Sequence, residues 1–165
     1  MLVSKQKMPK KELRLITIIV AFAIYFSEEI FFRDYFVDSH RKIYFFLLAA
    51  FITYFLHEGI HGLFAYIFKA RPKFGFRYTF FYTKLSGLIK RNYCLYIIIG
   101  PFILLNLIFL FLFFTYPILR SYLFFSFTLN TAGSVFDIWY FFTMLRYKKE
   151  HLIKDTMEGY EVYSE

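Results

Sequence analysis

Hydrophobic and polar residues occur in long separate blocks along this chain. Four apolar segments cover residues 15–32, 43–68, 93–118 and 121–145, and polar residues gather in the connections between them. A helix needs about 20 predominantly apolar residues to cross the hydrocarbon core of a bilayer, and each of these segments approaches or exceeds that length. The pattern predicts an all-α membrane protein with four transmembrane helices.

The longest polar connection lies between the second and third apolar segments. Residues 74–82 within it are rich in aromatic side chains, and Ser86 and Gly87 follow as a turn-forming pair. Aromatic residues bounded by a turn are typical of short strands. We therefore expect a short β-hairpin here. A chain of 165 residues without an internal repeat fits one domain, so residues 1–165 are predicted to form a single unit.

The basic residues predict how the chain is oriented. Of the 20 Lys and Arg residues, 16 lie in the N-terminal arm (1–14), the middle connection (69–92) and the polar C-terminal tail (146–165). Basic residues accumulate on the cytoplasmic side of membrane proteins. Both termini and the hairpin are thus predicted to be cytoplasmic. The first segment resembles a signal peptide, but the spans that follow favour an uncleaved first helix.

Composition excludes several other classes of protein. With 59% hydrophobic residues, including 26 Phe and 15 Tyr, the chain is too apolar for a soluble domain of this size. The net charge of +8 comes from residues that flank the apolar segments, so nucleic acid is not expected as a partner. Cys94 is the single cysteine and cannot form an internal disulfide. The expected partner is the lipid bilayer, and the sequence does not determine an oligomeric state.

The second apolar segment contains an H-E-x-x-H motif formed by His57, Glu58 and His61. Residues four apart share a helix face, so both imidazoles can bind one metal ion, and Glu58 can take a proton from a water at that ion. The alternative interpretation is two buried histidines that bond to neighbouring helices. Ionisable groups at membrane depth are costly unless they are paired or bind a metal, and this favours a Zn²⁺ site.

A zinc site of this kind needs a third protein ligand. Asp137 is a carboxylate inside the fourth apolar segment, where it requires a partner. At 1.5 Å per residue, its expected depth matches that of both histidines. Asn130 lies nearly two turns earlier on the same helix face, and we consider two roles for it, a donor to a substrate carbonyl or an interhelical hydrogen bond. Asn106 is expected to form an interhelical hydrogen bond.

Several motifs together resemble a known family. They are His57-Glu58-x-x-His61, Gly100-Pro101-Phe102, Asn130-x-x-Gly133-Ser134-x-x-Asp137, Asp155 and Glu161-Val162-Tyr163. This set resembles a family of small bacterial membrane proteins classed as zincin peptidases, which is similar in turn to the site-2 intramembrane metalloproteases. The likeness covers residues 51–163, most of the chain.

The resemblance implies a zinc-dependent intramembrane endopeptidase in the bacterial plasma membrane, acting on a membrane-protein or peptide substrate. It implies that His57, His61 and Asp137 bind Zn²⁺, that Glu58 is the general base and that Asn130 assists. The sequence departs from the site-2 proteases in one respect. Those enzymes usually have an N-P-x-P…L-D-G pattern, whereas Phe136 and Ile138 flank the aspartate here.

Two other functions remain open. One is a non-catalytic membrane protein, such as a transporter subunit or chaperone, with a structural or decayed zinc site. The other is a glutamate-dependent protease of the prenyl-protein type, suggested by Glu28-Glu29-x-x-x-Arg33. That class also needs an F-x-x-x-H motif, and neither His57 nor His61 has Phe four residues before it. A Glu29–Arg33 pair one helical turn apart explains the motif more simply.

Overall fold

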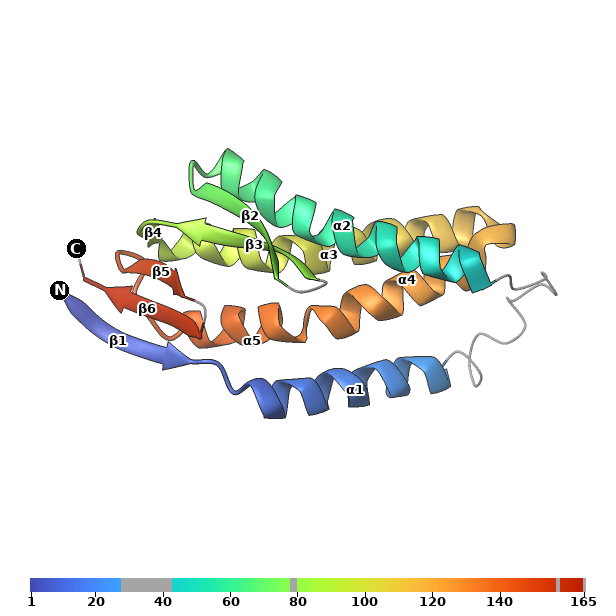
Figure 1. Ribbon diagram of the computed structural model, residues 1–165, viewed down its shortest axis with the longest axis horizontal. Helices are drawn as coiled ribbons and strands as arrows, with labels where there is room; N and C mark the ends of the chain where they lie inside the picture. The colour runs from blue at the N-terminus through green and yellow to red at the C-terminus, as the bar shows by residue number, and fades with distance from the viewer. Residues whose placement is uncertain (28–42, 78–79, 157, 165) are drawn as a thin grey trace. The chain divides into compact units, whose positions relative to one another are not determined.

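The computed structural model describes residues 1–27, 43–77, 80–156 and 158–164 (Figure 1). This described part is mostly helical, as the sequence predicts, but it contains a four-stranded sheet besides the predicted hairpin, so the protein is not all-α. Its α-helices are α1 (Lys10–Ser27), α2 (Ile43–Ile67), α3 (Arg91–Thr115), α4 (Arg120–Gly133) and α5 (Val135–Met144), with a 3₁₀ turn η3 (Pro117–Leu119) before α4. The motif at Glu28 and Glu29 lies outside the described residues.

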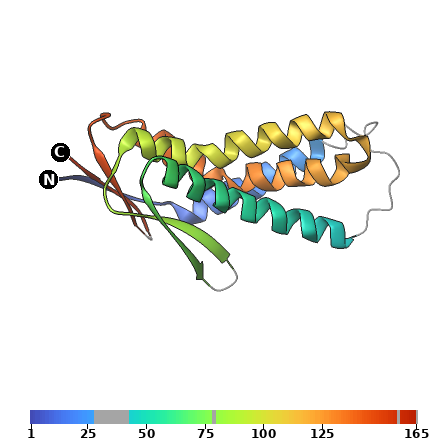
Figure 2. The ribbon, with the colours of Figure 1, turned by 90° about the horizontal axis from the view of Figure 1, so that it is seen from above.

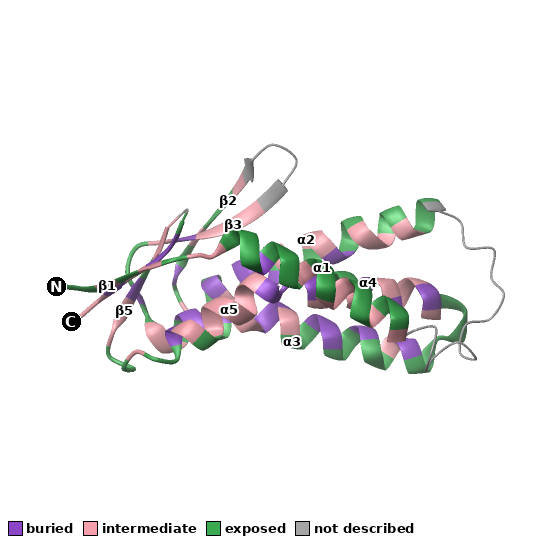
Figure 3. Ribbon diagram, turned by 90° about the horizontal axis from the view of Figure 1, so that it is seen from below, coloured by how far each residue is buried: buried purple, intermediate pink, exposed green. Residues whose placement is uncertain are grey.

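Two of these helices are long and apolar enough to cross a membrane, Tyr44–Ile67 and Arg91–Thr115. They correspond to the second and third predicted spans. Many of their large side chains are exposed, among them Leu47 at 64% and Phe111 at 68%. Figure 3 shows exposed and buried residues mixed along the length of the helices. Apolar surface of this extent is typical of helices that face lipid.

The fourth apolar segment, predicted as one helix, is divided into α4 and α5. Ser134 separates them with φ −75° and ψ 0°, and both its backbone N–H (2.9 Å) and its hydroxyl (2.7 Å) donate to the Asn130 carbonyl. Glycine has low helix propensity, and a serine hydroxyl competes for the carbonyl of the preceding turn. The Gly133-Ser134 pair therefore interrupts the helix.

The described chain forms two compact units, each built from segments that are distant in sequence. Unit 1 consists of Met1–Lys10, Glu58–Pro101 and Phe136–Glu165, and unit 2 of Lys11–His57 and Phe102–Val135. The boundary passes through two continuous helices. It falls after His57 in α2 and after Pro101 in α3.

Unit 1 contains a four-stranded antiparallel sheet in the order β1-β6-β5-β4. The strands are β1 (Leu2–Lys7), β4 (Ile89–Lys90), β5 (Leu152–Thr156) and β6 (Gly159–Tyr163). Figure 1 shows the two ends of the chain entering this sheet side by side. Ile153, Tyr160 and Val162 are fully buried in the hydrophobic core of the unit. The arm and tail, which the sequence describes only as polar, thus form regular structure.

A hairpin in this connection is confirmed, as β2 (Arg71–Arg77) and β3 (Phe80–Ser86), but the predicted turn at Ser86 and Gly87 is wrong, because the chain reverses between Arg77 and Phe80 and Ser86 ends β3. Figure 2 shows it leaving the end of α2 and turning back. The hairpin contacts α2 at Gly62, where an added Cβ would overlap the Phe74 ring. A glycine at this position lets the strand approach the helix closely, and this contact brings β3 to the histidine motif.

Candidate metal centre

His61 of α2 and Asp137 of α5 face each other in unit 1. His61 Nε2 lies 3.6 Å from Asp137 Oδ1, and His61 is buried. The other ring nitrogen, Nδ1, lies 2.8 Å from the carbonyl oxygen of Ile97 in α3. A carbonyl can only accept, so Nδ1 carries the proton and donates to it. In the neutral ring, the lone pair of His61 is therefore on Nε2, the nitrogen that faces Asp137.

His57 lies one helical turn before His61 and is oriented in the same way. In unit 2, its Nδ1 lies 2.9 Å from Asn130 Oδ1. The amide nitrogen of Asn130 donates to Asn106 Oδ1 at 2.9 Å, and Asn106 donates to Thr131 Oγ1 at 3.0 Å. This chain fixes Asn130 Oδ1 as the acceptor, so His57 also donates through Nδ1 and has its lone pair on Nε2.

His57, His61 and Asp137 each offer one ligand atom, and these atoms all lie within 4.8 Å of one another. The helix α2 runs unbroken through both histidines, so their spacing is a property of that helix. Two ligands at about 2.05 Å from a tetrahedral zinc ion are roughly 3.4 Å apart. The 3.6 Å between His61 and Asp137 is close to this value and longer than a direct hydrogen bond.

The chemistry of this donor set suits zinc. Two neutral imidazoles and one carboxylate are typical of catalytic zinc sites, which use three protein ligands and keep a fourth position open. Among the described residues, no fourth His, Cys, Asp or Glu belongs to the group. Both histidines donate their second ring nitrogen to a protein oxygen, an arrangement that orients zinc-binding imidazoles. These three residues could therefore hold a zinc ion.

Glu58 lies beside the histidines and is held by β3. Its Oε2 accepts a hydrogen bond from the Thr83 backbone N–H at 2.7 Å. The Thr83 hydroxyl donates to the Glu58 carbonyl oxygen at 3.0 Å. Two bonds to one residue of β3 fix both the backbone and the carboxylate of Glu58 against the hairpin.

A cavity of about 350 Å³ opens beside this group, within unit 1. Glu58, His61 and Asp137 contribute polar atoms to its wall, which also contains apolar side chains such as Ile97 and Met144. The cavity combines apolar walls with polar groups of the histidine motif. Such a combination is typical of a ligand-binding site.

Asp155 of β5 is a further carboxylate in the wall of this cavity. It accepts the Leu85 backbone N–H at 3.2 Å. Burial raises the pKa of the Asp155 carboxyl to about 6, although this hydrogen bond and nearby Lys84 act in the opposite direction. The sequence names Asp155 only through the family resemblance. No local pattern could place it here, because β5 is joined to this region through long-range pairing with β4.

The structure thus brings together the three residues that the sequence proposes as metal ligands, with Glu58 adjacent to them. Asn130 forms interhelical hydrogen bonds, one of the two roles considered for it from the sequence. Its amide oxygen bonds His57 and its amide nitrogen bonds Asn106, so it connects α2, α3 and α4 within unit 2. The interhelical hydrogen bond expected of Asn106 is confirmed.

This donor set, with an adjacent glutamate and a cavity, defines a site of the kind found in zinc metallopeptidases. The comparison with protein families agrees. The chain belongs to the family described as "Putative zincin peptidase", whose model matches residues 50–152. That range contains the whole histidine motif, Asn130 and Asp137. No curated protein and no solved structure matches the chain significantly.

Proposed function

We propose that this protein is a zinc-dependent endopeptidase that cleaves membrane-associated substrates. The observation that carries the proposal is the grouping of three ligand atoms within 4.8 Å, with Glu58 one residue from His57. His57, His61 and Asp137 are assigned as the metal ligands. Glu58 is assigned as the general base, and Asn130 as the residue that orients His57.

The reaction is hydrolysis of a peptide bond. Zinc, when bound, polarises the substrate carbonyl and makes a bound water more acidic. Glu58 accepts a proton from the water that attacks the carbonyl carbon, and it then delivers this proton to the leaving nitrogen as the C–N bond breaks. The products are a carboxylate and an amine, so one water molecule is consumed and Glu58 is regenerated.

We propose that the substrate binds in extended form along the outer edge of β3. Thr83 lies opposite Phe74 and Leu85 opposite Pro72 in the hairpin. The N–H groups of Thr83 and Leu85 donate to Glu58 and Asp155. They therefore point away from β2, as alternate residues of an edge strand do.

Added strands bind through such edge donors. Carbonyl groups of a substrate strand would accept the N–H groups of Thr83 and Leu85. The Glu58 carboxylate would then be released from Thr83 and could reach the attacking water. In this scheme, the base becomes available when the substrate is in place.

The membrane location is part of the proposal. Two helices that could span a bilayer, α2 and α3, carry His57, His61 and the Ile97 carbonyl that bonds His61. We propose that the protein is a multi-pass protein of the bacterial plasma membrane, with four crossings and both termini in the cytoplasm. The distribution of Lys and Arg supports this orientation.

The decisive experiment compares Glu58→Gln with wild type in purified protein reconstituted into lipid vesicles. The variant should retain one zinc ion per chain, measured by elemental mass spectrometry, and lose cleavage of a quenched-fluorescence library of transmembrane peptides. Glu150→Gln is a matched control, since it makes the same chemical change at an exposed residue. Unchanged cleavage in Glu58→Gln would exclude Glu58 as the general base.

The same samples separate the proposal from a non-catalytic zinc protein. The three-ligand set favours catalysis, because structural zinc sites usually have four protein ligands. If wild type holds stoichiometric zinc but does not cleave the peptide library, and if cells that express wild type or Glu58→Gln have the same membrane proteome, the site is structural. His61→Ala should lose the metal under either function.

A further inference from the structure

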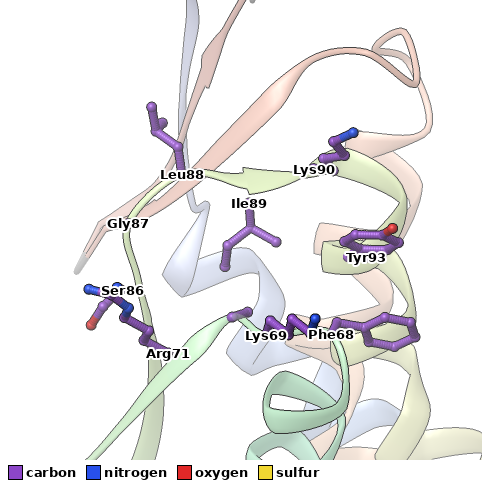
Figure 4. Close-up of a pocket in the computed structure, with 10 residues that line it drawn as sticks. Phe68, Lys69, Arg71, Ser86, Gly87, Leu88, Ile89, Lys90 and Tyr93 are labelled. Carbon is purple, nitrogen blue, oxygen red and sulfur yellow. The ribbon is translucent and has the colours of Figure 1, made fainter.

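A second cavity, of about 430 Å³, lies in unit 1 away from the histidine motif. It is formed where α2 ends, where α3 begins and where β2, β3 and β4 meet these helices (Figure 4). Figure 4 shows Ile89 pointing into the space between Arg71 and Tyr93. The two candidate spans end at Ile67 and begin at Arg91, so this cavity lies at the ends of both.

The cavity is basic and contains no acidic residue. Lys69, Arg71 and Lys90 line it from three different segments, and all three are exposed. Within the described part of the chain, none of these three side chains forms an ion pair. The Ser86 hydroxyl adds a neutral donor. The site therefore offers positive charge and hydrogen-bond donors that the described protein does not itself neutralise.

Lys69 occupies a backbone position that disfavours lysine. It ends α2 in a Schellman motif, in which its N–H bonds the Tyr66 carbonyl (3.0 Å) and the Ala70 N–H bonds the Ala65 carbonyl (2.8 Å). Its φ of 56° is left-handed. Glycine adopts this conformation without strain, whereas other residues lose on the order of 1 kcal/mol. A strained residue with a charged side chain in a cavity suggests that the side chain has a use.

An aromatic pair forms one wall. Phe68 and Tyr93 stack with ring centroids 5.1 Å apart and an interplanar angle of 16°. The first turn of α3 also lies here, and the N-terminus of a helix carries partial positive charge. Cations, a hydroxyl and aromatic rings at the ends of apolar helices suit a phosphate whose attached groups continue toward lipid.

We propose that this cavity binds a phosphate group, carried either by the headgroup of an anionic phospholipid or by a free phosphate. The guanidinium of Arg71 can form paired hydrogen bonds to phosphate oxygens, while the two lysines act as point charges. Binding here requires neither the metal nor proteolysis.

The test uses the full-length protein in detergent with two probes. Native mass spectrometry measures retention of phosphatidylglycerol, and calorimetry measures binding of inorganic phosphate. The triple variant Lys69→Gln, Arg71→Gln, Lys90→Gln should weaken binding roughly a hundredfold, because each basic side chain near an anionic group contributes on the order of fivefold. The control Lys73→Gln, Lys148→Gln, Lys149→Gln removes three exposed cations that do not line the cavity. It should bind like wild type.

The two probes identify the source of the phosphate. If the triple variant loses only the retention of phosphatidylglycerol, the site is assigned to a headgroup. If the triple variant also loses the binding of inorganic phosphate, the site is assigned to free phosphate. Wild-type protein that binds neither probe would overturn the proposal. So would a control variant that loses as much binding as the triple variant.

Lys69→Gly separates binding from folding. Glycine relieves the left-handed backbone strain at this position, so the unfolding temperature should stay the same or rise, while phosphate binding should weaken about fivefold. A residue with only a structural role would not produce opposite effects. Unchanged phosphate binding in Lys69→Gly would exclude Lys69 from the site.

Discussion

The hydrogen bond between Asn130 and His57 predicts a specific loss of zinc affinity. Asn130 is 2% exposed, and it accepts from His57 Nδ1 at 2.9 Å while donating to Asn106 at 2.9 Å. Asn130→Leu retains the approximate volume of the side chain and removes both bonds. His57 then loses the acceptor that fixes its tautomer and ring orientation. Losing such a partner typically reduces metal affinity 10–100-fold, so we expect roughly that decrease.

The same substitution should lower stability. Each buried polar group that loses its partner costs about 1–3 kcal/mol, and two groups are affected, so the free energy of unfolding should fall by about 2–6 kcal/mol. Asn106→Leu is the matched control, because it breaks the buried network but leaves the bond between His57 and Asn130. It should lower stability by a similar amount and change zinc affinity by less than about threefold.

The assay is competition for zinc between the purified protein and a chromophoric chelator, with thermal unfolding of the zinc-free protein measured in parallel. Asn130→Asp adds a third measurement, because its carboxylate still accepts from His57 and should restore much of the affinity that Asn130→Leu loses. The reasoning fails if Asn130→Leu binds zinc within about twofold of wild type, or if Asn106→Leu loses as much affinity.

Three further predictions concern the hairpin and the sheet. Thr83→Pro removes the N–H that contacts Glu58, whereas Thr83→Val keeps it. Cleavage should fall sharply in the proline variant only, and the zinc content of both variants should be unchanged. Equal cleavage by the two variants would contradict binding of the substrate along β3. Burial raises the pKa of the Asp155 carboxyl to about 6, above the ordinary value near 3.9, so the folded state binds this proton more tightly than the unfolded state. The free energy of unfolding should therefore fall by about 3 kcal/mol as the pH rises from about 4 to 6. Asp155→Asn should remove this fall in urea titrations at several pH values, and a slope equal to that of wild type would exclude Asp155 as its origin. Ile153→Ala, in a fully buried strand residue, should lower stability by 2–5 kcal/mol in the same titrations, while a loss below about 1 kcal/mol would show that the sheet contributes little.

Helices and ligands could be predicted because their signals are local. Long apolar blocks give α2 and α3, and the spacing of four residues places His57 and His61 on one face of α2. Asp137 could be found because a carboxylate inside an apolar segment requires a partner. The aromatic residues of this connection predicted a hairpin, but the turn was misplaced, because Ser86 ends β3 and the chain reverses between Arg77 and Phe80.

The four-stranded sheet could not be predicted from the same patterns. Lys5 of β1 lies opposite Glu161 of β6, more than 150 residues along the chain. Neither segment has the strict alternation of polar and apolar residues that identifies an isolated strand. The pairing depends on tertiary structure, and so does the position of Asp155 in the cavity wall.

The position of Asn130 shows the same limit. Its place on a helix face was available from the sequence, but the identity of its neighbours was not. Ser134 separates α4 from α5 between Asn130 and Asp137, so the prediction of one uninterrupted helix is wrong at this point. Only the hydrogen bonds to His57 and Asn106 distinguish orienting a ligand from contacting a substrate.

Under the proposed membrane location, the continuous sheet restricts how the chain can be threaded through a bilayer. Strands β1, β4, β5 and β6 are joined by backbone hydrogen bonds, and such strands cannot lie on opposite sides of a hydrocarbon layer. The chain must therefore return to its starting side between Lys7 and Ile89, and again between Lys90 and Leu152. Each passage made by α2 or α3 would require a partner passage in the opposite direction, for which the described residues offer α1 and the α4–α5 segment. An odd number of membrane passages between Lys7 and Ile89, or between Lys90 and Leu152, is excluded.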